Sequence, residues 1–145
     1  MNIQKVLVIG AGQMGSGIAQ VCAQAGFDVK LNDREQQFYD RGIQTITNNL
    51  SRNVEKGRMT EDEKQSVLNK ITMSLSMEDA NDVDLVIEAA VENMEIKQSI
   101  FKQLDDITPA HTILATNTSS LPITEIAAAT NRPEHVIGMH FMNPV

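Results

Sequence analysis

The sequence predicts a doubly wound α/β domain whose sheet is mostly parallel. Short apolar runs with the composition of buried strands alternate along the chain with longer segments whose apolar residues recur at helical spacing. The first run, residues 5–9, leads directly into a glycine-rich turn and an alanine-rich helix, and Asp33 follows the second run. Because strands that alternate with helices pair in parallel through crossover connections, this order favours a doubly wound sheet.

The first half of the chain is predicted to form three strands and three helices. Strands are expected near residues 3–9, 28–31 and 71–74, and helices near residues 14–25, 35–56 and 60–69. Gly26 and Gly57 follow two of these helices, where capping glycines are common. Thr60 and Glu63 have the spacing of a capping box for the third helix. The two helices after the second strand exceed a simple crossover, which indicates a helical hairpin insertion that is either functional or a cover for the sheet.

The second half of the chain continues the alternation. Strands are expected at residues 83–87, 112–115 and 136–138, and helices at residues 94–104 and from Pro122 onward. The sequence contains no internal repeat, low-complexity segment or interdomain linker. Residues 1–145 are therefore predicted to form a single domain, which agrees with a length of 145 residues.

The turn after the first strand has the pattern of a dinucleotide-binding βαβ unit. It comprises Gly10, Ala11, Gly12, Gln13, Met14 and Gly15. In this pattern the first glycine permits the tight turn, the second lets the backbone approach a pyrophosphate, and the third allows the helix to pack closely on the strand. The positive end of the helix faces the phosphates, and Asp33 accepts hydrogen bonds from the adenine ribose. Glycines in a tight loop can be purely conformational, but the flanking strand, helix and acidic residue together favour cofactor binding.

Composition narrows the classes of partner and location. Hydrophobic residues make up 41% of the chain, the formal net charge is −7 and no basic cluster is present, so we expect no nucleic-acid partner. No apolar run is long enough to cross a bilayer and the N-terminus does not resemble a signal peptide, so we expect no membrane association and a cytoplasmic location. The single cysteine, Cys22, is interpreted as a small core residue. The three histidines lack metal-ligand spacing, so no metal site is predicted.

Polar residues follow several predicted strands, at the edge where open α/β sheets bind ligands. They are the turn at residues 10–15, Asp33, residues 88–93, residues 117–120, and His140 with Asn143. His140 is a candidate proton donor and acceptor beside a nicotinamide, or else a histidine that only bonds a loop. Ser119 is a candidate hydrogen-bond donor to a substrate oxygen, or else a helix N-cap. Lys97 is expected to meet a phosphate or to lie in solvent, and His111 and His135, before strands at the opposite edge, are interpreted as structural.

Four segments together carry a more specific pattern than the glycine turn alone. They are residues 8–20, 85–92, 117–121 and 138–144. In these segments, and along its whole length, the chain resembles the NAD-binding domain of the 3-hydroxyacyl-CoA dehydrogenases, most closely the short bacterial 3-hydroxybutyryl-CoA dehydrogenases. The family usually has phenylalanine where this chain has Met142, which is a modest apolar change.

The resemblance implies an NAD cofactor and reversible hydride transfer between NAD and C3 of an acyl-CoA, with 3-hydroxybutyryl-CoA and acetoacetyl-CoA as the substrate pair. It implies that His140 is the general base or acid and that Ser119 hydrogen-bonds the reacting oxygen. The cofactor-binding residues that it implies are Gly10, Ala11, Gly12, Gln13, Met14, Gly15, Asp33, Glu92, Lys97, Asn117, Ser119 and Asn143. The substrate-binding residues that it implies are Ser119, Asn143 and, in the helical hairpin, Lys56.

Members of the family continue with a glutamate that orients the histidine and with a helical C-terminal domain that closes the substrate cleft and forms a homodimer or higher oligomer. This chain ends at Val145, before both, so the isolated segment is expected to bind NAD(H) with weak or no turnover. Asp33 favours NAD over NADP because its carboxylate repels a 2′-phosphate, although Arg34 can reach such a phosphate. Two alternatives are a non-catalytic NAD-sensing module, which needs only the glycine turn and Asp33, and a β-hydroxyacid dehydrogenase, which depends on a lysine further along.

Overall fold

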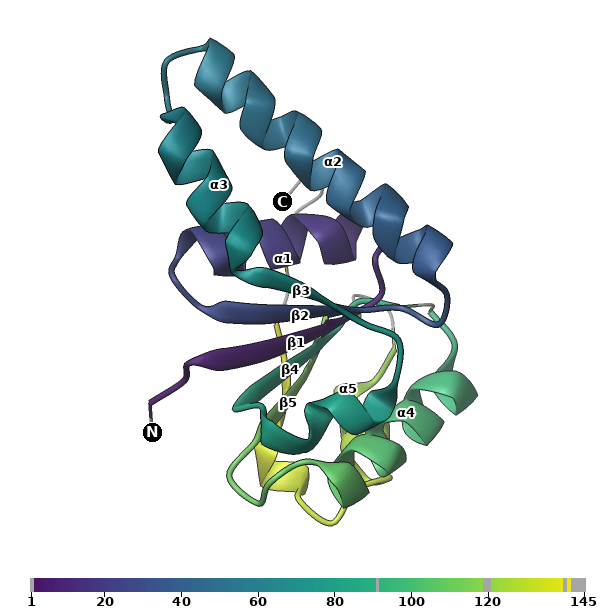
Figure 1. Cartoon of the computed structure of the whole chain (residues 1–145). Coiled ribbons are helices and arrows are strands. Elements are labelled where there is room, and N and C mark those ends of the chain that lie inside the picture. Colours follow the sequence, from purple (N-terminus) through teal and green to yellow (C-terminus); the bar gives the residue numbers. More distant parts are fainter. Residues whose placement is uncertain (1, 91, 119–120, 140, 142–145) are drawn as a thin grey trace.

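The computed structural model describes residues 2–90, 92–118, 121–139 and 141, and it shows a six-stranded sheet with helices on both faces (Figure 1). The strands lie in the order β3-β2-β1-β4-β5-β6, and every adjacent pair is parallel. The order reverses between β1 and β4, which places the ligand crevice of a doubly wound sheet at the carboxyl ends of these two strands. The predicted fold class is confirmed.

All of the predicted strands and helices form, with ends that differ by a few residues. The strands are β1 Lys5–Ile9, β2 Asp28–Asn32, β3 Ile71–Ser74, β4 Leu85–Glu88, β5 Ile113–Thr116 and β6 Val136–Gly138. The helices are α1 Gln13–Gln24, α2 Gln36–Glu55, α3 Glu61–Asn69, α4 Met94–Ile107 and α5 Ile123–Ala127. Two 3₁₀ helices, Met77–Asp82 and Pro133–His135, are not expected from the sequence, because such short segments carry no clear periodicity.

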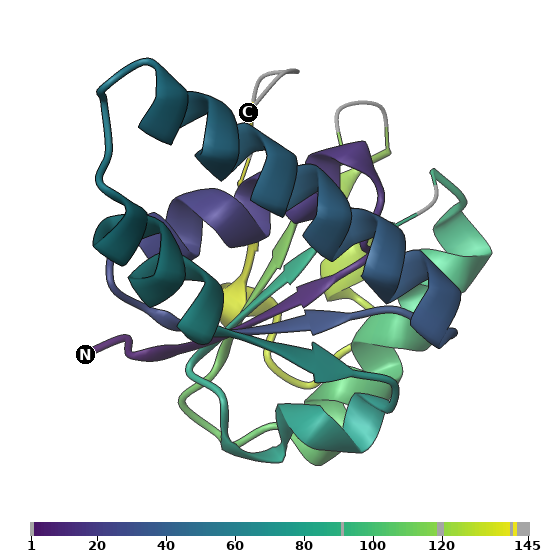
Figure 2. The ribbon, with the colours of Figure 1, turned by 45° about the horizontal axis from the view of Figure 1, so that its top comes forward.

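The core has one apolar layer on each face of the sheet. Val6 and Val8 of β1 belong to the layer that α1 and α2 cover, together with Val29 of β2. Leu7 and Ile9 belong to the opposite layer, which α4 covers. Figure 2 shows α1, α2 and α3 on one side of the strands and α4 on the other. Because both faces are covered, the central strands β1 and β4 are apolar at successive positions and do not alternate with polar residues.

Helices α2 and α3 form a helical hairpin that lies against α1 (Figure 1). Ile46 of α2 is fully buried in this contact, and Asn49 Nδ2 donates a hydrogen bond to Gln20 Oε1 at 3.3 Å. The predicted capping box is confirmed at the start of α3, where Thr60 and Glu63 exchange hydrogen bonds of 3.0 and 3.1 Å. No helix in the described part of the chain is long and apolar enough to cross a membrane.

Candidate cofactor site

The turn between β1 and α1 leaves no room for a side chain at two of its glycines. Gly10 has a φ of +100°, and a Cβ atom there would lie 2.8 Å from the carbonyl oxygen of Ala89. A Cβ atom on Gly15 would lie 1.6 Å from the carbonyl oxygen of Gly10, so α1 rests directly on the turn. The predicted tight turn at Gly10 is confirmed, whereas the close approach at Gly15 is to the turn rather than to the strand.

Gly12 stands at the N-cap of α1 and differs from the other two glycines. Its φ is −72°, and among the described residues no atom outside its immediate neighbours in the chain lies within 4 Å of the position that a Cβ atom would take. Gln13 and Met14 form the first turn of α1, and Gly12 supplies no side-chain cap to their N–H groups. Open space beside N–H groups at the positive end of a helix suits a phosphate.

Asp33 is fixed by the backbone at the end of β2. Its Oδ2 accepts a hydrogen bond from the Ala11 N–H at 2.8 Å, and its Oδ1 accepts one from the Arg34 N–H at 2.7 Å. The Gly10 N–H donates to the Asn32 carbonyl oxygen at 2.8 Å, which joins the turn to the same strand end. Each carboxylate oxygen retains a lone pair, so the held side chain can still accept hydrogen bonds from ribose hydroxyls.

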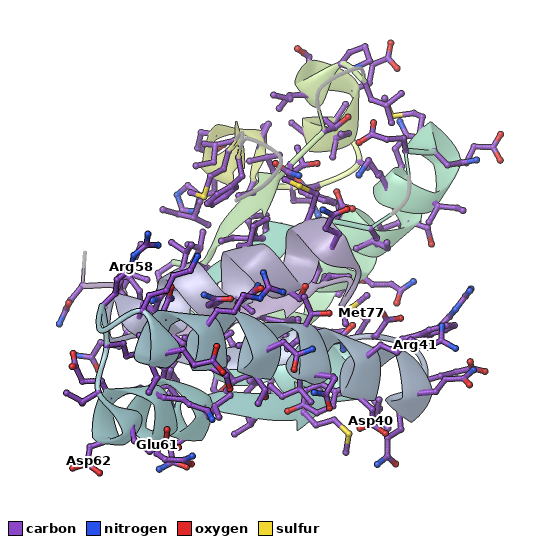
Figure 3. All side chains as sticks on the ribbon, turned by 90° about the horizontal axis from the view of Figure 1, so that it is seen from above. Asp40, Arg41, Arg58, Glu61, Asp62 and Met77 are labelled. Atoms are coloured by element: carbon purple, nitrogen blue, oxygen red, sulfur yellow. The ribbon has the colours of Figure 1, made fainter. Side chains whose placement is uncertain are left out.

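A cleft of about 650 Å³ opens beside the glycine turn and Asp33. Its lining includes Gly10, Ala11, Gly12, Asn32, Asp33, Arg34, Phe38, Arg41, Leu75, Met77, Ala89, Ala90, Ile96 and Ile100. Leu75 and Ile96 remain 43% and 46% exposed, although side chains this large and apolar are usually buried. Figure 3 shows Arg41 and Met77 toward the same end of α2. A cleft of this volume, with apolar walls and few polar groups, fits a planar nucleobase and its ribose.

Lys97, which the sequence predicts at a phosphate or in solvent, is buried. Its side chain is 1% exposed, and its Nζ lies 2.5 Å from Oε1 of Glu88, which is 0% exposed. The expectation that Lys97 lies in solvent is therefore wrong, because its ammonium group is paired inside the domain. Its contact with the cofactor stays a prediction.

The chain segments that follow β4, β5 and β6 are hydrogen-bonded to one another at the same edge of the sheet. Thr118 Oγ1 donates to Glu92 Oε2 at 2.6 Å, which joins the segments after β5 and β4. The Phe141 N–H donates to Asn117 Oδ1 at 3.0 Å, which joins the segments after β6 and β5. The sequence expectation that these strand ends converge is thus met for the described residues.

Three predicted site residues, Ser119, His140 and Asn143, lie outside the described residues, and the same holds for Met142. The predicted roles of Ser119 as a substrate contact or a helix N-cap, and of His140 as a general base, therefore stay predictions. Their described neighbours Thr118 and Phe141 belong to the hydrogen-bonded strand ends.

Lys56 lies far from the glycine turn along α2. It is the exposed C-cap of this helix, whose N-terminal part reaches the cleft through Phe38 and Arg41. At about 1.5 Å per residue, a helix of 20 residues extends roughly 30 Å. Figure 3 shows Arg58, which follows Lys56 closely, at the opposite end of α2 from Arg41. The structure does not bring Lys56 together with the other predicted residues.

Gly42 of α2 is a site residue that the sequence reasoning missed. A Cβ atom on it would lie 2.8 Å from the carbonyl oxygen and 3.1 Å from the Cβ of Ala11, so α2 approaches the glycine turn at backbone distance. The available signal was a glycine inside a helical pattern, which costs about 1 kcal/mol relative to alanine and therefore indicates a packing role.

Cys22 and His111 have the structural roles that the sequence predicts. Cys22 is 9% exposed within the core layer under α1, and burial raises the pKa of its thiol to about 11. His111 Nε2 lies 2.8 Å from Asp84 Oδ1, at the edge of the sheet opposite the cleft. Neither side chain belongs to the cleft.

These features define a dinucleotide-binding domain of the Rossmann type: a parallel sheet with this strand order, a glycine turn after β1 and an anchored aspartate after β2. Residues 5–145 match the family model described as "3-hydroxyacyl-CoA dehydrogenase, NAD binding domain". The chain belongs to this family, and its cofactor is NAD.

Relatives and solved structures agree with this assignment. The chain is 57% identical to the probable 3-hydroxybutyryl-CoA dehydrogenase of Bacillus subtilis over 145 residues, which are 100% of this chain and 50% of the relative. A crystal structure of (S)-3-hydroxybutyryl-CoA dehydrogenase from Ralstonia eutropha superposes with a TM-score of 0.96 at 44% identity, covering 99% of this chain and 51% of the other. FadB2 of M. tuberculosis gives a TM-score of 0.97 at 44% identity, with 100% and 51% coverage. The chain thus spans about half the length of these proteins.

Proposed function

We propose that this chain is the NAD-binding part of a 3-hydroxybutyryl-CoA dehydrogenase, which transfers hydride reversibly between C3 of the acyl-CoA and NAD. The observation that carries the proposal is the joining of the strand ends, in which Thr118 bonds to Glu92 and Phe141 to Asn117. An NAD-sensing module requires only the glycine turn and Asp33, so a built arrangement of three further strand ends favours an enzyme. Relatives that carry this enzyme name support the substrate.

The described residues suit the adenosine diphosphate part of the cofactor. The N-terminus of α1 beside Gly12 faces the pyrophosphate, and Asp33 accepts hydrogen bonds from the adenine ribose. The exposed apolar side chains of Leu75 and Ile96 cover the adenine. When bound, NAD supplies the hydride acceptor.

Two residues near the strand ends complete the proposed chemistry. His140 takes the proton of the 3-hydroxyl group during oxidation and returns it during reduction, as a positioned histidine base does. Ser119 donates a hydrogen bond to the reacting oxygen. Glu92, Asn117 and Asn143 hold the nicotinamide side of the cofactor, and Lys97 supports this side from inside the domain through its contact with Glu88.

The acyl-CoA side and the assembly are the remaining parts of the proposal. Lys56, exposed at the end of α2, meets the coenzyme A portion, which gives the helical hairpin a binding function in addition to covering α1. A helical domain of the kind found in the family would supply the orienting glutamate and the contacts of a homodimer or higher oligomer. The enzyme acts in the cytoplasm, on a free acyl-CoA and without a nucleic-acid or membrane partner.

The test is a fluorescence titration of the 145-residue chain with NADH, followed by addition of acetoacetyl-CoA to the same sample. We expect saturable NADH binding and little oxidation. Absence of NADH binding would contradict the proposed function. Rapid oxidation would show that this segment suffices for turnover, and would contradict the expectation that it does not.

A second experiment separates the enzyme from the sensor. In a protein that also carries the family's helical domain, His140→Ala should lower the rate of acetoacetyl-CoA reduction by about 10²–10⁴-fold, while NADH binding is unchanged. A sensor would lose nothing on this substitution. Asn131→Ala, an exposed change outside the proposed site, serves as the control.

A further inference from the structure

The carboxylate of Glu88 collects hydrogen bonds from three different segments of the domain. Its Oε1 accepts from Lys97 Nζ of α4 at 2.5 Å and from Thr116 Oγ1 of β5 at 2.8 Å. Its Oε2 accepts from the Ala90 N–H, in the loop after β4, at 2.7 Å. Glu88 and Lys97 are 0% and 1% exposed, so this is a charged junction inside the core.

Two of these hydrogen bonds, to Ala90 and to Thr116, are called the first and second arms of the junction. The first arm reaches the wall of the cofactor cleft. Ala89 and Ala90 both line the cleft, and the Ala89 carbonyl oxygen lies 2.8 Å from the position of a Cβ atom on Gly10. The loop held by Oε2 of Glu88 is therefore packed against the glycine turn. A displacement of Ala90 would move one side of the cleft relative to the other.

The second arm reaches the segment that leads to Ser119. Thr116 Oγ1 gives its only proton to the carboxylate of Glu88, which can only accept, and so retains a lone pair for the Thr118 N–H at 3.3 Å. Thr118 Oγ1 in turn gives its proton to Glu92 and accepts from the Leu121 N–H at 3.1 Å. Because the carboxylates of Glu88 and Glu92 only accept hydrogen bonds, they determine the direction of the bonds made by Thr116 and Thr118.

Stability does not explain a charged pair at this place. Two charges lose their hydration on burial, and a buried ion pair is commonly no more stabilising than well-packed apolar residues of the same volume. A pair that is buried, bonded to three segments and next to the cleft indicates a role in setting geometry.

We propose that Glu88 and Lys97 are a positioning pair, which sets the distance between the cleft wall at Ala90 and the segment from Thr116 to Thr118. Lys97 acts through Glu88: its ammonium group holds the carboxylate in one orientation, and the carboxylate holds the loop at Ala90 and the side chain of Thr116. The part of this inference that concerns Ser119 and NADH rests on the proposed function, whereas the arrangement of the arms does not.

The variants are chosen so that folding and positioning can be told apart. Lys97→Met alone leaves an unpaired buried carboxylate and should lower the melting temperature strongly. Glu88→Gln with Lys97→Met removes both charges at nearly constant volume and should restore most of the melting temperature. Thr116→Val breaks only the second arm, and Thr116→Ser is its conservative rescue. The control is Lys5→Met with Asp82→Asn, an exposed pair with a separation of 3.1 Å at the opposite edge of the sheet.

The first readout is the amide resonances of Ala90 and Thr118 in NMR spectra of the cofactor-free chain. The neutral double variant should shift both resonances, Thr116→Val should shift that of Thr118 alone, and Thr116→Ser and the control pair should shift neither. Unchanged resonances in the double variant would overturn the positioning role, whether or not the chain binds NADH.

The second readout is the dissociation constant for NADH. The double variant, with its melting temperature restored, should bind NADH about tenfold more weakly than the unsubstituted chain. The control variant should bind NADH as the unsubstituted chain does. If the double variant recovered both its melting temperature and its NADH affinity, the pair would have only a structural role and the inference would be overturned. If the unsubstituted chain does not bind NADH, the proposed function fails, and the amide resonances alone decide the positioning pair.

Discussion

The Ala11 N–H donates a hydrogen bond of 2.8 Å to Asp33 Oδ2, so the turn after β1 holds the carboxylate that ends β2. The glycine turn, proposed to bind the pyrophosphate, and Asp33, proposed to bind the adenine ribose, are thus joined directly. Since the Arg34 N–H holds the other oxygen, the carboxylate is already oriented before a ribose arrives. Such pre-orientation reduces the ordering cost of binding.

The charge of Asp33 should determine the choice between NADH and NADPH. A 2′-phosphate at about 4 Å from this carboxylate is repelled by roughly 4 kcal/mol at an effective dielectric constant near 20. Asp33→Asn keeps an oxygen for the Ala11 N–H and removes the charge. The dissociation constant for NADPH divided by that for NADH should therefore fall at least tenfold. Fluorescence titration measures both constants. A lower dissociation constant for NADPH than for NADH in the unsubstituted chain would refute the assignment.

Two glycines of the turn should separate binding from folding. Gly12→Ala should change the free energy of unfolding by less than about 0.5 kcal/mol, because open space surrounds its Cβ position, yet should weaken NADH binding strongly. Gly15→Ala should cost about 3 kcal/mol or more, because its methyl group would lie 1.6 Å from a backbone oxygen. Urea unfolding and NADH titration test both. Normal NADH affinity in Gly12→Ala would exclude close approach of the pyrophosphate at this position.

Gly42→Ala should weaken NADH binding although Gly42 is not in the turn. A methyl group there would press on Ala11, whose N–H holds Asp33, so the dissociation constant should rise about tenfold. Alanine favours the helix by about 1 kcal/mol, which offsets part of the strain in the free energy of unfolding. The control, Gln44→Ala, changes an exposed residue of the same helix. Equal NADH affinity in the two variants would show that the α2 contact does not position the turn.

Arg132 should contribute strongly to stability, because its largely buried side chain joins α4 to the loop before β5. Its guanidinium group donates to Asp105 Oδ1 at 2.7 Å and to the carbonyl oxygens of Asp105, Thr108, Pro109 and Thr112. Arg132→Ala should cost about 3–5 kcal/mol, because it leaves a buried carboxylate unpaired. Arg132→Lys should rescue little, since a single ammonium group cannot span these acceptors. Urea unfolding measures these free energies, with the exposed Arg52→Ala as a control. If Arg132→Ala and Arg132→Lys unfolded at the same urea concentration as the unsubstituted chain, this prediction would be wrong.

Asp84 should make stability fall in acid. The backbone N–H of Gln4, then the His111 ring and the Lys5 N–H, lower the pKa of its carboxyl from 3.8 to about 2. Because the pKa is lower in the folded state, the stabilisation is complete above pH 3.8 and disappears as the pH falls to about 2. The unfolding midpoints of the unsubstituted chain and Asp84→Asn should therefore differ at pH 7 and converge near pH 2. If the difference between the two midpoints were the same at both pH values, the lowered pKa of Asp84 would not be its cause. The exposed substitution Asp28→Asn is the control.

Local patterns in the sequence were sufficient to predict the elements and the cofactor turn. The capping box at Thr60 and Glu63 and the positive φ at Gly10 depend on residues that are adjacent or three apart. Such interactions are encoded within one turn of the chain, so spacing reveals them. The ends of β4 and α4 differ from the predicted ones by a few residues, because the last residues of an element fray and its local pattern determines them only weakly.

Residue patterns alone were enough to predict that apolar strands alternate with helices, that a glycine turn precedes an aspartate, and that polar residues follow the strands. They could not predict that Lys97 is buried on Glu88 instead of exposed, or that Gly42 touches the turn. In both cases the partners come from different elements, and burial depends on how those elements pack. A lysine on an amphipathic helix has the same local pattern whether its ammonium group faces water or a carboxylate, so its environment is settled by packing alone.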